Sequence, residues 1–104
     1  MDAQLKRGLM EICVLAATQG KDTYGYQIIK DISPKLEMTE STLYPILKRL
    51  ETGNFLSVYN VEHNGRLRKY YRITDAGKLR INDFVREWDE VVSLYEFIKS
   101  GAEE

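Results

Sequence analysis

The side chains best suited to chemistry lie in residues 39–54, a segment with the pattern of a helix that has two different faces. Its apolar residues recur at positions i, i+3, i+4 and i+7, the stripe that a helix buries against a core: Leu43, Ile46, Leu47 and Leu50. The opposite face combines hydroxyls and cations with one proline: Ser41, Thr42, Tyr44, Pro45, Lys48 and Arg49. Hydroxyl donors and cations suit the phosphates and base edges of nucleic acids. We therefore expect this face to point outward, toward a partner.

A second group of cations lies in a predicted hairpin. Asn64-Gly65 favours a two-residue turn, because both positions accept positive φ. After Glu62 the tip and the return strand contain cations and no acid: Arg66, Arg68, Lys69 and Arg72. Strand alternation puts the three arginines on one side and Lys69 on the other. Asn64 and Arg66 at the tip fit a minor groove or a phosphate clamp, whereas a solvated hairpin also carries cations simply to protect its edges.

Catalytic and metal-binding chemistry finds few candidates in this chain. The one histidine, His63, lies at the mouth of the predicted turn, where a polar turn residue is its simpler description. No His, Cys or carboxylate cluster has metal-ligand spacing, and no glycine-rich phosphate loop is present. The single Cys13 lies among apolar residues and is expected to be a packed thiol. The sequence therefore predicts no catalytic residue, no metal and no cofactor.

Three helices are expected to support these groups. The first runs from about Gln4 to Thr18, with a predicted core face of Leu5, Leu9, Ile12, Cys13 and Ala16. Asp22 or Thr23 is expected to cap the second, which ends near Ile32 and turns inward Tyr24, Ile28, Ile29 and Ile32. The third is capped by Thr39 or Ser41. A start near Ser41 is favoured, because the missing N–H of Pro45 costs little only in the first turn.

The remaining elements complete a winged helix-turn-helix. The third helix is expected to end at Gly53-Asn54, where the backbone can adopt the left-handed conformation of a C-cap. Strands are predicted over 55–62 and 67–73. Thr74-Asp75 starts a last helix that reaches about Lys99 and is followed by a frayed tail over 100–104. The expected fold class is mostly α with a small β-hairpin. Residues 1–74 form the winged helix domain, and residues 75–104 form a dimerisation helix packed as part of the same unit.

Length and charge fit one ordinary domain. The chain has 104 residues, 43% hydrophobic and 30% charged, with no apolar run long enough for a bilayer and no signal peptide, so a cytoplasmic protein is expected.

The net charge of −1 argues by itself against a nucleic-acid partner, yet the charges are distributed unevenly along the chain. Residues 1–74 hold 11 Lys and Arg against 8 acids, whereas residues 75–104 hold 4 against 8. Because salt screens charges beyond about 10 Å, the local basic surface matters more than the sum.

The last helix carries an apolar seam spaced 3, 4, 3, 4, 3, as in a coiled coil: Ile81, Phe84, Trp88, Val91, Tyr95 and Ile98. A helix of roughly 25 residues is about 37 Å long, whereas the preceding unit is about 30 Å across, so its far half is left uncovered. A bare seam would exceed the apolar patch that soluble monomers expose. A two-fold homodimer would cover it and would present two third helices to one operator.

Taken together, these segments resemble the PadR family of bacterial winged-helix transcriptional regulators, in its short-tailed form. The matching segments cover nearly the whole chain: 5–15, 24–28, 41–51, 65–71 and 73–77. The resemblance implies a homodimer that binds a palindromic operator in double-stranded DNA, usually as a repressor. By position, it puts the polar set of residues 41–49 in the major groove and Arg66, Arg68 and Lys69 on the wing. Tyr24 and Tyr26 would approach phosphates.

Two further readings stay open from the sequence. Relatives in this family are often released by small aromatic or hydrophobic effectors, and Trp88 could stack such a ligand, although burial in a dimer seam also accounts for it. Alternatively, the winged helix has lost nucleic-acid binding and serves as a protein-interaction module. The wing discriminates this alternative from DNA binding, because a phosphate-binding wing must keep its cations. The effector reading depends instead on Trp88 facing a cavity.

Overall fold

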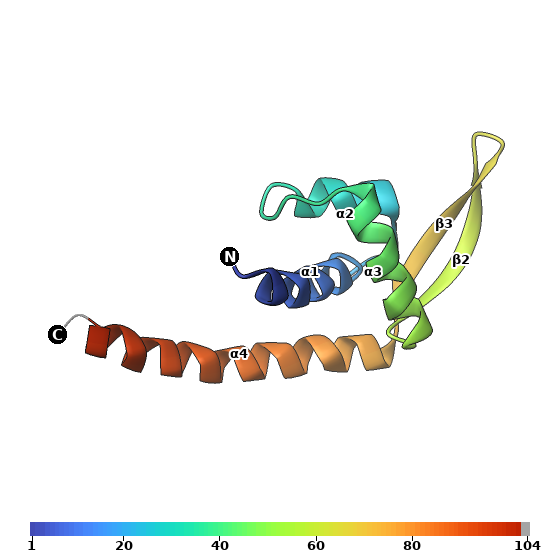
Figure 1. Ribbon diagram of the computed structural model, residues 1–104. Coiled ribbons are helices and arrows are strands. Elements are labelled where there is room, and N and C mark those ends of the chain that lie inside the picture. The colour runs from blue at the N-terminus through green and yellow to red at the C-terminus, as the bar shows by residue number, and fades with distance from the viewer. Residues whose placement is uncertain (103–104) are drawn as a thin grey trace.

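The computed structural model describes residues 1–102, in four helices and a small sheet (Figure 1). In chain order the elements are α1 (Ala3–Ala17), β1 (Thr23–Tyr24), α2 (Gly25–Ile32), α3 (Glu40–Thr52), β2 (Leu56–His63), β3 (Arg66–Ile73) and α4 (Asp75–Ala102). The first three helices pack on one another, β2 and β3 project from them as a wing, and α4 runs along the base of the molecule and extends beyond it. The predicted fold class, mostly helical with a winged helix-turn-helix, is confirmed.

The core lies where α1, α2 and α3 meet the base of the sheet. The whole predicted apolar stripe of α3 is buried, with at most 3% of each side chain exposed. The other elements contribute Val14, Leu15, Ile28, Ile32, Leu56, Tyr71 and Ile81, and Met38 enters from the segment before α3. Because α3 buries one face completely, its opposite face is held in a fixed orientation.

The sheet has three strands in the order β1-β3-β2, one more than the sequence predicted. The hairpin itself is confirmed: β2 and β3 pair antiparallel, and Asn64 and Gly65 take φ values of 53° and 78° in the turn. The missed strand, β1, has two residues, Thr23 and Tyr24, which pair with Tyr71 and Tyr70. A two-residue strand leaves no alternating pattern for sequence analysis to detect.

Two helix starts differ from the prediction. Tyr24, not Asp22 or Thr23, is the N-cap of α2, because Thr23 is still extended and paired in the sheet. Thr39, not Ser41, is the N-cap of α3, and the Leu43 N–H donates to the Thr39 carbonyl at 2.9 Å. Pro45 therefore lies inside the helix rather than in its first turn, at an outward position that leaves its ring exposed.

The predicted core face of α1 was also wrong in part. Leu5 is 46% exposed and Ala16 is exposed, whereas Val14 and Leu15 are completely buried. Leu5 belongs to a separate apolar stripe that faces an open cleft beside α4. The helix α1 carries two apolar stripes, and periodicity alone does not show which of them the core buries. The prediction chose the stripe that faces the cleft. Cys13 is half-buried, and this burial raises the pKa of its thiol.

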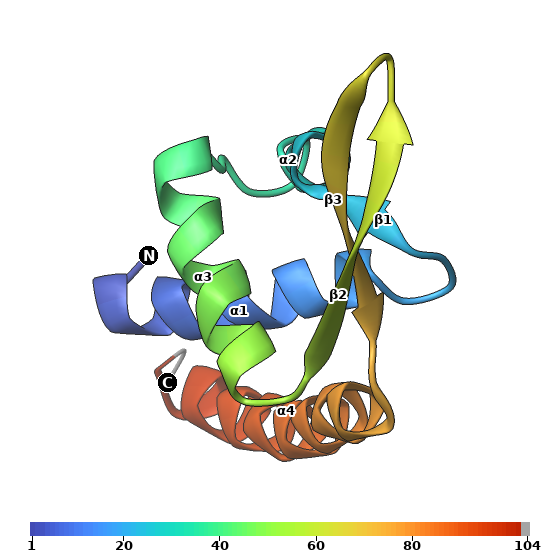
Figure 2. The same cartoon turned by 90° about the vertical axis from the view of Figure 1, so that its right-hand side faces the viewer.

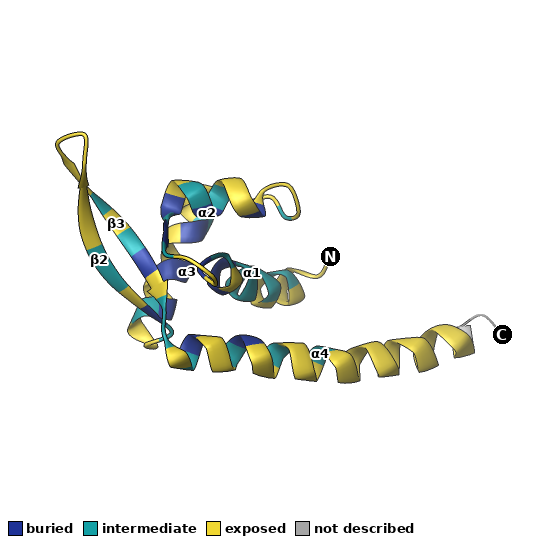
Figure 3. Ribbon diagram, turned by 180° about the vertical axis from the view of Figure 1, so that it is seen from behind, coloured by how far each residue is buried: buried dark blue, intermediate teal, exposed yellow. Residues whose placement is uncertain are grey.

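The last helix is longer than predicted and mostly uncovered (Figure 3). The Thr74 hydroxyl accepts from the Gly77 N–H at 3.1 Å, as its predicted capping role requires. Residues 100–102, predicted as a frayed tail, are helical, and residues 103–104 of that tail lie outside the described residues. The described chain measures 63 × 26 × 21 Å with a radius of gyration of 16.3 Å, against about 13 Å for a compact domain of this length. No helix in the described part of the chain combines the length and apolarity of a membrane span.

Candidate nucleic-acid interface

The outward face of α3 carries the polar residues that the sequence singled out. Ser41, Pro45 and Lys48 form its outermost ridge, and each is exposed. Thr42 and Arg49 lie on the flank toward α1, while Tyr44, 49% exposed, lies on the flank toward the wing. Figure 2 shows α3 in front, with the wing rising on one side and the N-terminal end of α1 on the other. The helix therefore stands between two flanking elements.

The wing is stiffened by three tyrosine rings that pack side by side across the sheet. Tyr70 of β3 packs between Tyr24 and Tyr59, with ring centroids 5.4 and 5.7 Å away. The Arg68 guanidinium lies 4.1 Å above the Tyr24 ring, a cation–π contact that holds its aliphatic stem against the sheet. These packed rings, tilted between Tyr24 and Tyr70 and stacked between Tyr59 and Tyr70, fix the base of a hairpin whose outer half projects beyond the body of the domain.

One wing arginine is not free. The Asp22 carboxylate accepts from the Tyr59 hydroxyl at 2.5 Å and from the Arg72 Nε at 3.0 Å, and Arg72 Nη2 lies 2.9 Å from the same oxygen. The hydrogen bonds from Arg72 and then Tyr59 lower the pKa of the Asp22 carboxyl. This network ties the loop before β1 to the base of the wing. Arg72 therefore acts as an internal ion-pair partner, unlike the other two arginines of the hairpin.

A cleft of about 380 Å³ separates α3 from the wing. Its walls are aromatic and basic: Tyr24, Gly25, Tyr26, Tyr44, Arg68, Lys69 and Tyr71. Gly25 is buried at the start of α2, and a Cβ on it would lie 2.7 Å from the Tyr44 hydroxyl oxygen. The absence of a side chain at Gly25 thus allows Tyr44 to pack against α2 while its edge stays exposed. Lys69 also lies 3.7 Å from Glu51, an ion pair exposed on both sides and worth little.

A second cleft, of about 400 Å³, lies on the opposite flank of α3. Its walls come from α1 and α3 and include no acid: Ala3, Lys6, Arg7, Met10, Ser41, Thr42, Pro45, Ile46 and Arg49. Sequence reasoning did not single out Lys6 or Arg7, although two adjacent cations at the start of a helix were a visible signal. Gly25 was also missed, because its importance depends on Tyr44 packing against it.

At the wing tip, Asn64 and Arg66 are exposed. His63 ends β2 opposite Arg66 and is exposed as well, which agrees with its description as a polar hairpin residue. Within residues 1–102 no group of three or more His, Cys, Asp or Glu is placed to hold a metal ion.

The apolar seam of α4 divides into two parts. Ile81 is 8% exposed and belongs to the core of its own chain, so little of it is left for a partner. Phe84 and Trp88 are half-buried and stacked, with ring centroids 5.5 Å apart. Farther along, Val91, Tyr95 and Ile98 are 42%, 53% and 64% exposed. Their exposure agrees with the expectation that the domain cannot cover the far half of α4.

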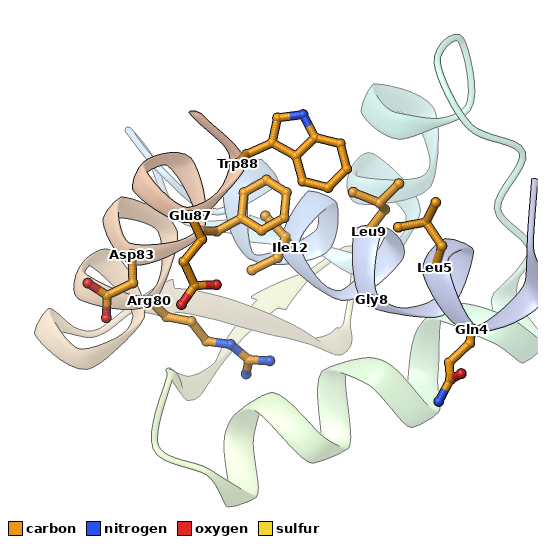
Figure 4. A pocket seen from close by; sticks show the side chains of 10 residues that line it. Gln4, Leu5, Gly8, Leu9, Ile12, Arg80, Asp83, Glu87 and Trp88 are labelled. Atoms are coloured by element: carbon orange, nitrogen blue, oxygen red, sulfur yellow. The ribbon is translucent and has the colours of Figure 1, made fainter. Parts of the chain in front are cut away.

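Between α1 and α4 lies an open cleft of about 490 Å³ beside Trp88 (Figure 4). Leu5, Leu9 and Ile12 of α1 form its apolar floor, and Trp88 faces them from α4. Carboxylates of Asp83 and Glu87 lie on its rim. The predicted core stripe of α1 and the seam of α4 thus border one apolar surface that this chain leaves open.

Comparisons with known proteins agree with this architecture. The model of the transcriptional regulator PadR-like family matches residues 14–83. A crystal structure of a Streptococcus mutans protein is 41% identical, with a TM-score of 0.80, and the match covers 91% of this chain and 90% of that one. A PadR family transcription regulator from Clostridium difficile is 31% identical, with a TM-score of 0.77, over 84% of this chain and 94% of that one.

The fold is also that of a regulator solved with nucleic acid. Bacillus subtilis PadR in complex with operator DNA has a TM-score of 0.68 to this chain at 22% identity, over 74% of this chain and 46% of that one. The family is one of transcriptional regulators rather than enzymes. With its matching family segment and its winged helix-turn-helix, this chain belongs to the PadR-like family of transcriptional regulators.

Proposed function

We propose that this chain is a cytoplasmic repressor that binds a palindromic operator in double-stranded DNA as a homodimer. One observation carries the proposal: the exposed ridge of α3 stands beside a stiff wing whose Arg66 and Arg68 make no ion pair within residues 1–102. A rigid helix with hydroxyls and cations on its free face suits the major groove. Arginines without internal partners suit phosphates, because each contact releases condensed counterions.

Under this proposal the residues divide by role. Ser41, Tyr44 and Lys48 enter the major groove on or beside the ridge, and Pro45 packs against base or sugar edges. Thr42 and Arg49 lie at the side of the groove. Asn64 and Arg66 at the wing tip, with Arg68 and Lys69 farther down, hold the adjoining backbone or minor groove. The operator-bound relative shares this fold, which supports the assignment.

Dimerisation accounts for the uncovered half of α4. Residues 1–74 form the DNA-binding domain, and the segment 75–104 contains the dimerisation helix α4, whose first turns are part of the same core through Ile81. The bare seam then meets the open α1–α4 cleft of a second copy, with Phe84, Trp88, Val91, Tyr95 and Ile98 at the contact. Two-fold symmetry presents two α3 helices to one duplex, and such a dimer represses by occupying a promoter.

Selection of bound duplexes from a random pool tests the proposal most directly. The expected product is a palindrome with half-sites one or two helical turns apart, bound with an affinity that falls steeply as salt rises. Repression is checked by transcription from a promoter that contains the selected site. If the protein enriches no duplex and binds DNA without salt dependence, the protein-interaction alternative is favoured instead.

A second function, the sensing of a flat aromatic effector, is favoured by the stacked Phe84 and Trp88 beside an open cleft. Trp88 is the single tryptophan of the chain, so its fluorescence reports on the site. A planar aromatic ligand is expected to quench this fluorescence with saturation and to weaken operator binding. Quenching that rises linearly without saturation, at unchanged operator affinity, counts against a sensing role.

A further inference from the structure

The recognition helix has a basic cleft on each side, and the cleft next to α1 is not explained by the wing. A helix in the major groove has a sugar-phosphate backbone on both of its sides. The cleft on one side of α3 belongs to the wing and contains Arg68 and Lys69. The cleft on the other side contains Lys6 and Arg7 of α1 together with Arg49 of α3.

The charges of this second cleft are uncompensated. No acid lines it, and within residues 1–102 none of Lys6, Arg7 and Arg49 makes an ion pair. Nearby, the acid Glu11 of α1 points to the other side of its helix and pairs with Arg80 at 3.0 Å. Along α1, Lys6 and Arg7 thus lie on the side of α3, and Glu11 lies on the side of α4.

Hydroxyls complete the chemistry of the cleft. Ser41 and Thr42, at the start of α3, border the same space as the three cations. The Thr39 hydroxyl lies 3.1 Å from the Ser41 hydroxyl and 3.2 Å from that of Thr42, so these side chains are held as a small group at the helix start. Cations beside hydroxyl donors are the usual partners of a phosphate diester.

We infer that this cleft, defined by Lys6, Arg7 and Arg49, binds neighbouring backbone phosphates of the DNA strand on the side of α3 away from the wing, with Lys6 and Arg7 on different phosphates. The inference rests on the proposed DNA-binding function and adds a third contact element, α1, to it. The two clefts then grip the two backbones that border one major groove, with α3 between them. Figure 2 shows the supporting elements, α1 and the wing, on opposite sides of α3. Arg49 contacts backbone on this flank, and base reading is left to the ridge.

The test is a salt titration of affinity for Lys6→Ala and Arg7→Ala, on the selected operator and on an unrelated duplex. Each substitution is expected to lower the slope of log affinity against log salt by about 0.9. The loss relative to the unsubstituted protein therefore shrinks about 3.5-fold between 50 and 200 mM salt, by the same factor on both duplexes. Arg86→Ala is the matched control, because it removes an equal charge from α4, where Arg86 pairs with Asp83, and it should leave the slope unchanged.

A second measurement locates the contact. Single phosphates of the operator are replaced by uncharged methylphosphonates, and one position should weaken the unsubstituted protein but not Arg7→Ala. Unchanged slopes in both alanine variants, with full binding by the unsubstituted protein, overturn the inference and leave the proposed function standing. Failure of the unsubstituted protein to bind any duplex overturns both. Circular dichroism confirms that the variants fold, which alanine in a helix favours.

Discussion

At the scale of single residues, the cations of this chain fall into two groups. Arg72 and Arg80 form ion pairs with Asp22 and Glu11 of the same chain. Arg66 and Arg68 form no ion pair within residues 1–102. Sequence alternation grouped Arg66, Arg68 and Arg72 on one side of a strand, and the register confirms this. It could not separate Arg72 from the others, because its partner Asp22 lies 50 residues earlier in the chain.

Arg66→Ala should weaken DNA binding about equally across sequences and reduce the salt slope by about 0.9, as the loss of one phosphate contact requires. The measurement is a salt titration on two unrelated duplexes. Arg66→Lys is the control, since it keeps the charge at the wing tip and should keep the slope. A slope that stays the same in the alanine variant removes Arg66 from the backbone contacts.

The Asp22 network predicts a pH effect on stability. Because Arg72 and Tyr59 lower the pKa of Asp22 in the folded protein, its ionised form stabilises the fold above the ordinary carboxyl pKa of about 4. That contribution is lost as pH falls below this value toward the lowered pKa. Thermal unfolding between about pH 6 and pH 2 should therefore show a smaller acid-induced loss in Asp22→Asn.

Arg72→Gln is the companion variant for this measurement. It removes the larger cause of the shift but leaves the Tyr59 hydrogen bond, so it should reduce the acid-induced loss in part, and the double variant should resemble Asp22→Asn. If both single variants retain the full acid dependence of the unsubstituted protein, the network contributes nothing measurable to stability. Both groups are exposed enough that a small effect is expected.

At the scale of elements, α3, the hairpin and the start of α4 could be predicted from the sequence, while the exact starts of α2 and α3 and the strand β1 could not. The apolar stripe of α3 and the Asn64-Gly65 turn are each set by residues close in the sequence, so both can be recognised without knowledge of the tertiary fold. The cap of α2 depends on Thr23 pairing with Tyr71 in β3. Such long-range pairing overrides the local preference of Asp22 and Thr23 for a capping position.

The contact between α2 and α3 gives a prediction at this scale. Gly25→Ala puts a Cβ where the Tyr44 hydroxyl lies, so the Tyr44 ring must move within the wing-side cleft. Operator affinity should fall on the order of tenfold, about 1.4 kcal/mol, while the fold is retained. The affinity is measured by fluorescence anisotropy of a labelled operator.

The matched control uses Tyr44→Ala as the background. Without the Tyr44 ring nothing is displaced, so adding Gly25→Ala should have little further effect on affinity. Equal losses in the two backgrounds mean that the methyl group acts through something other than Tyr44. Thermal unfolding of each variant separates a loss of affinity from a loss of structure.

At the scale of the whole molecule, the elongated shape is the most informative feature. The sequence predicted a seam on the last helix, and its far half is exposed over Val91, Tyr95 and Ile98. Ile81, however, lies in the core of the chain, because the first turns of α4 pack against α1 and β3. Periodicity describes which residues share a face but not which of them meet their own domain, so the boundary inside the seam was not predictable.

Trp88→Ala should mainly weaken dimerisation. Removal of a large aromatic side chain from a buried seam costs about 3 kcal/mol, which raises the dimer dissociation constant on the order of a hundredfold. Sedimentation velocity over a concentration series measures it. Trp88→Phe, which keeps a ring beside Phe84, should lose much less. An unchanged dissociation constant in the alanine variant places the association surface elsewhere.

The bare end of α4 has a consequence for how much protein a cell must hold. Residues 89–101 are exposed, and their turns extend a helix whose first half packs on the domain, so without neighbours they depend on propagation alone and are only marginally stable in water. Under the proposed homodimer, winding of those turns is coupled to pairing, and both depend on the concentration of the chain. Diluted subunits would then lose ellipticity together with operator occupancy, so the rates of synthesis and degradation of the chain would set how strongly its target is repressed.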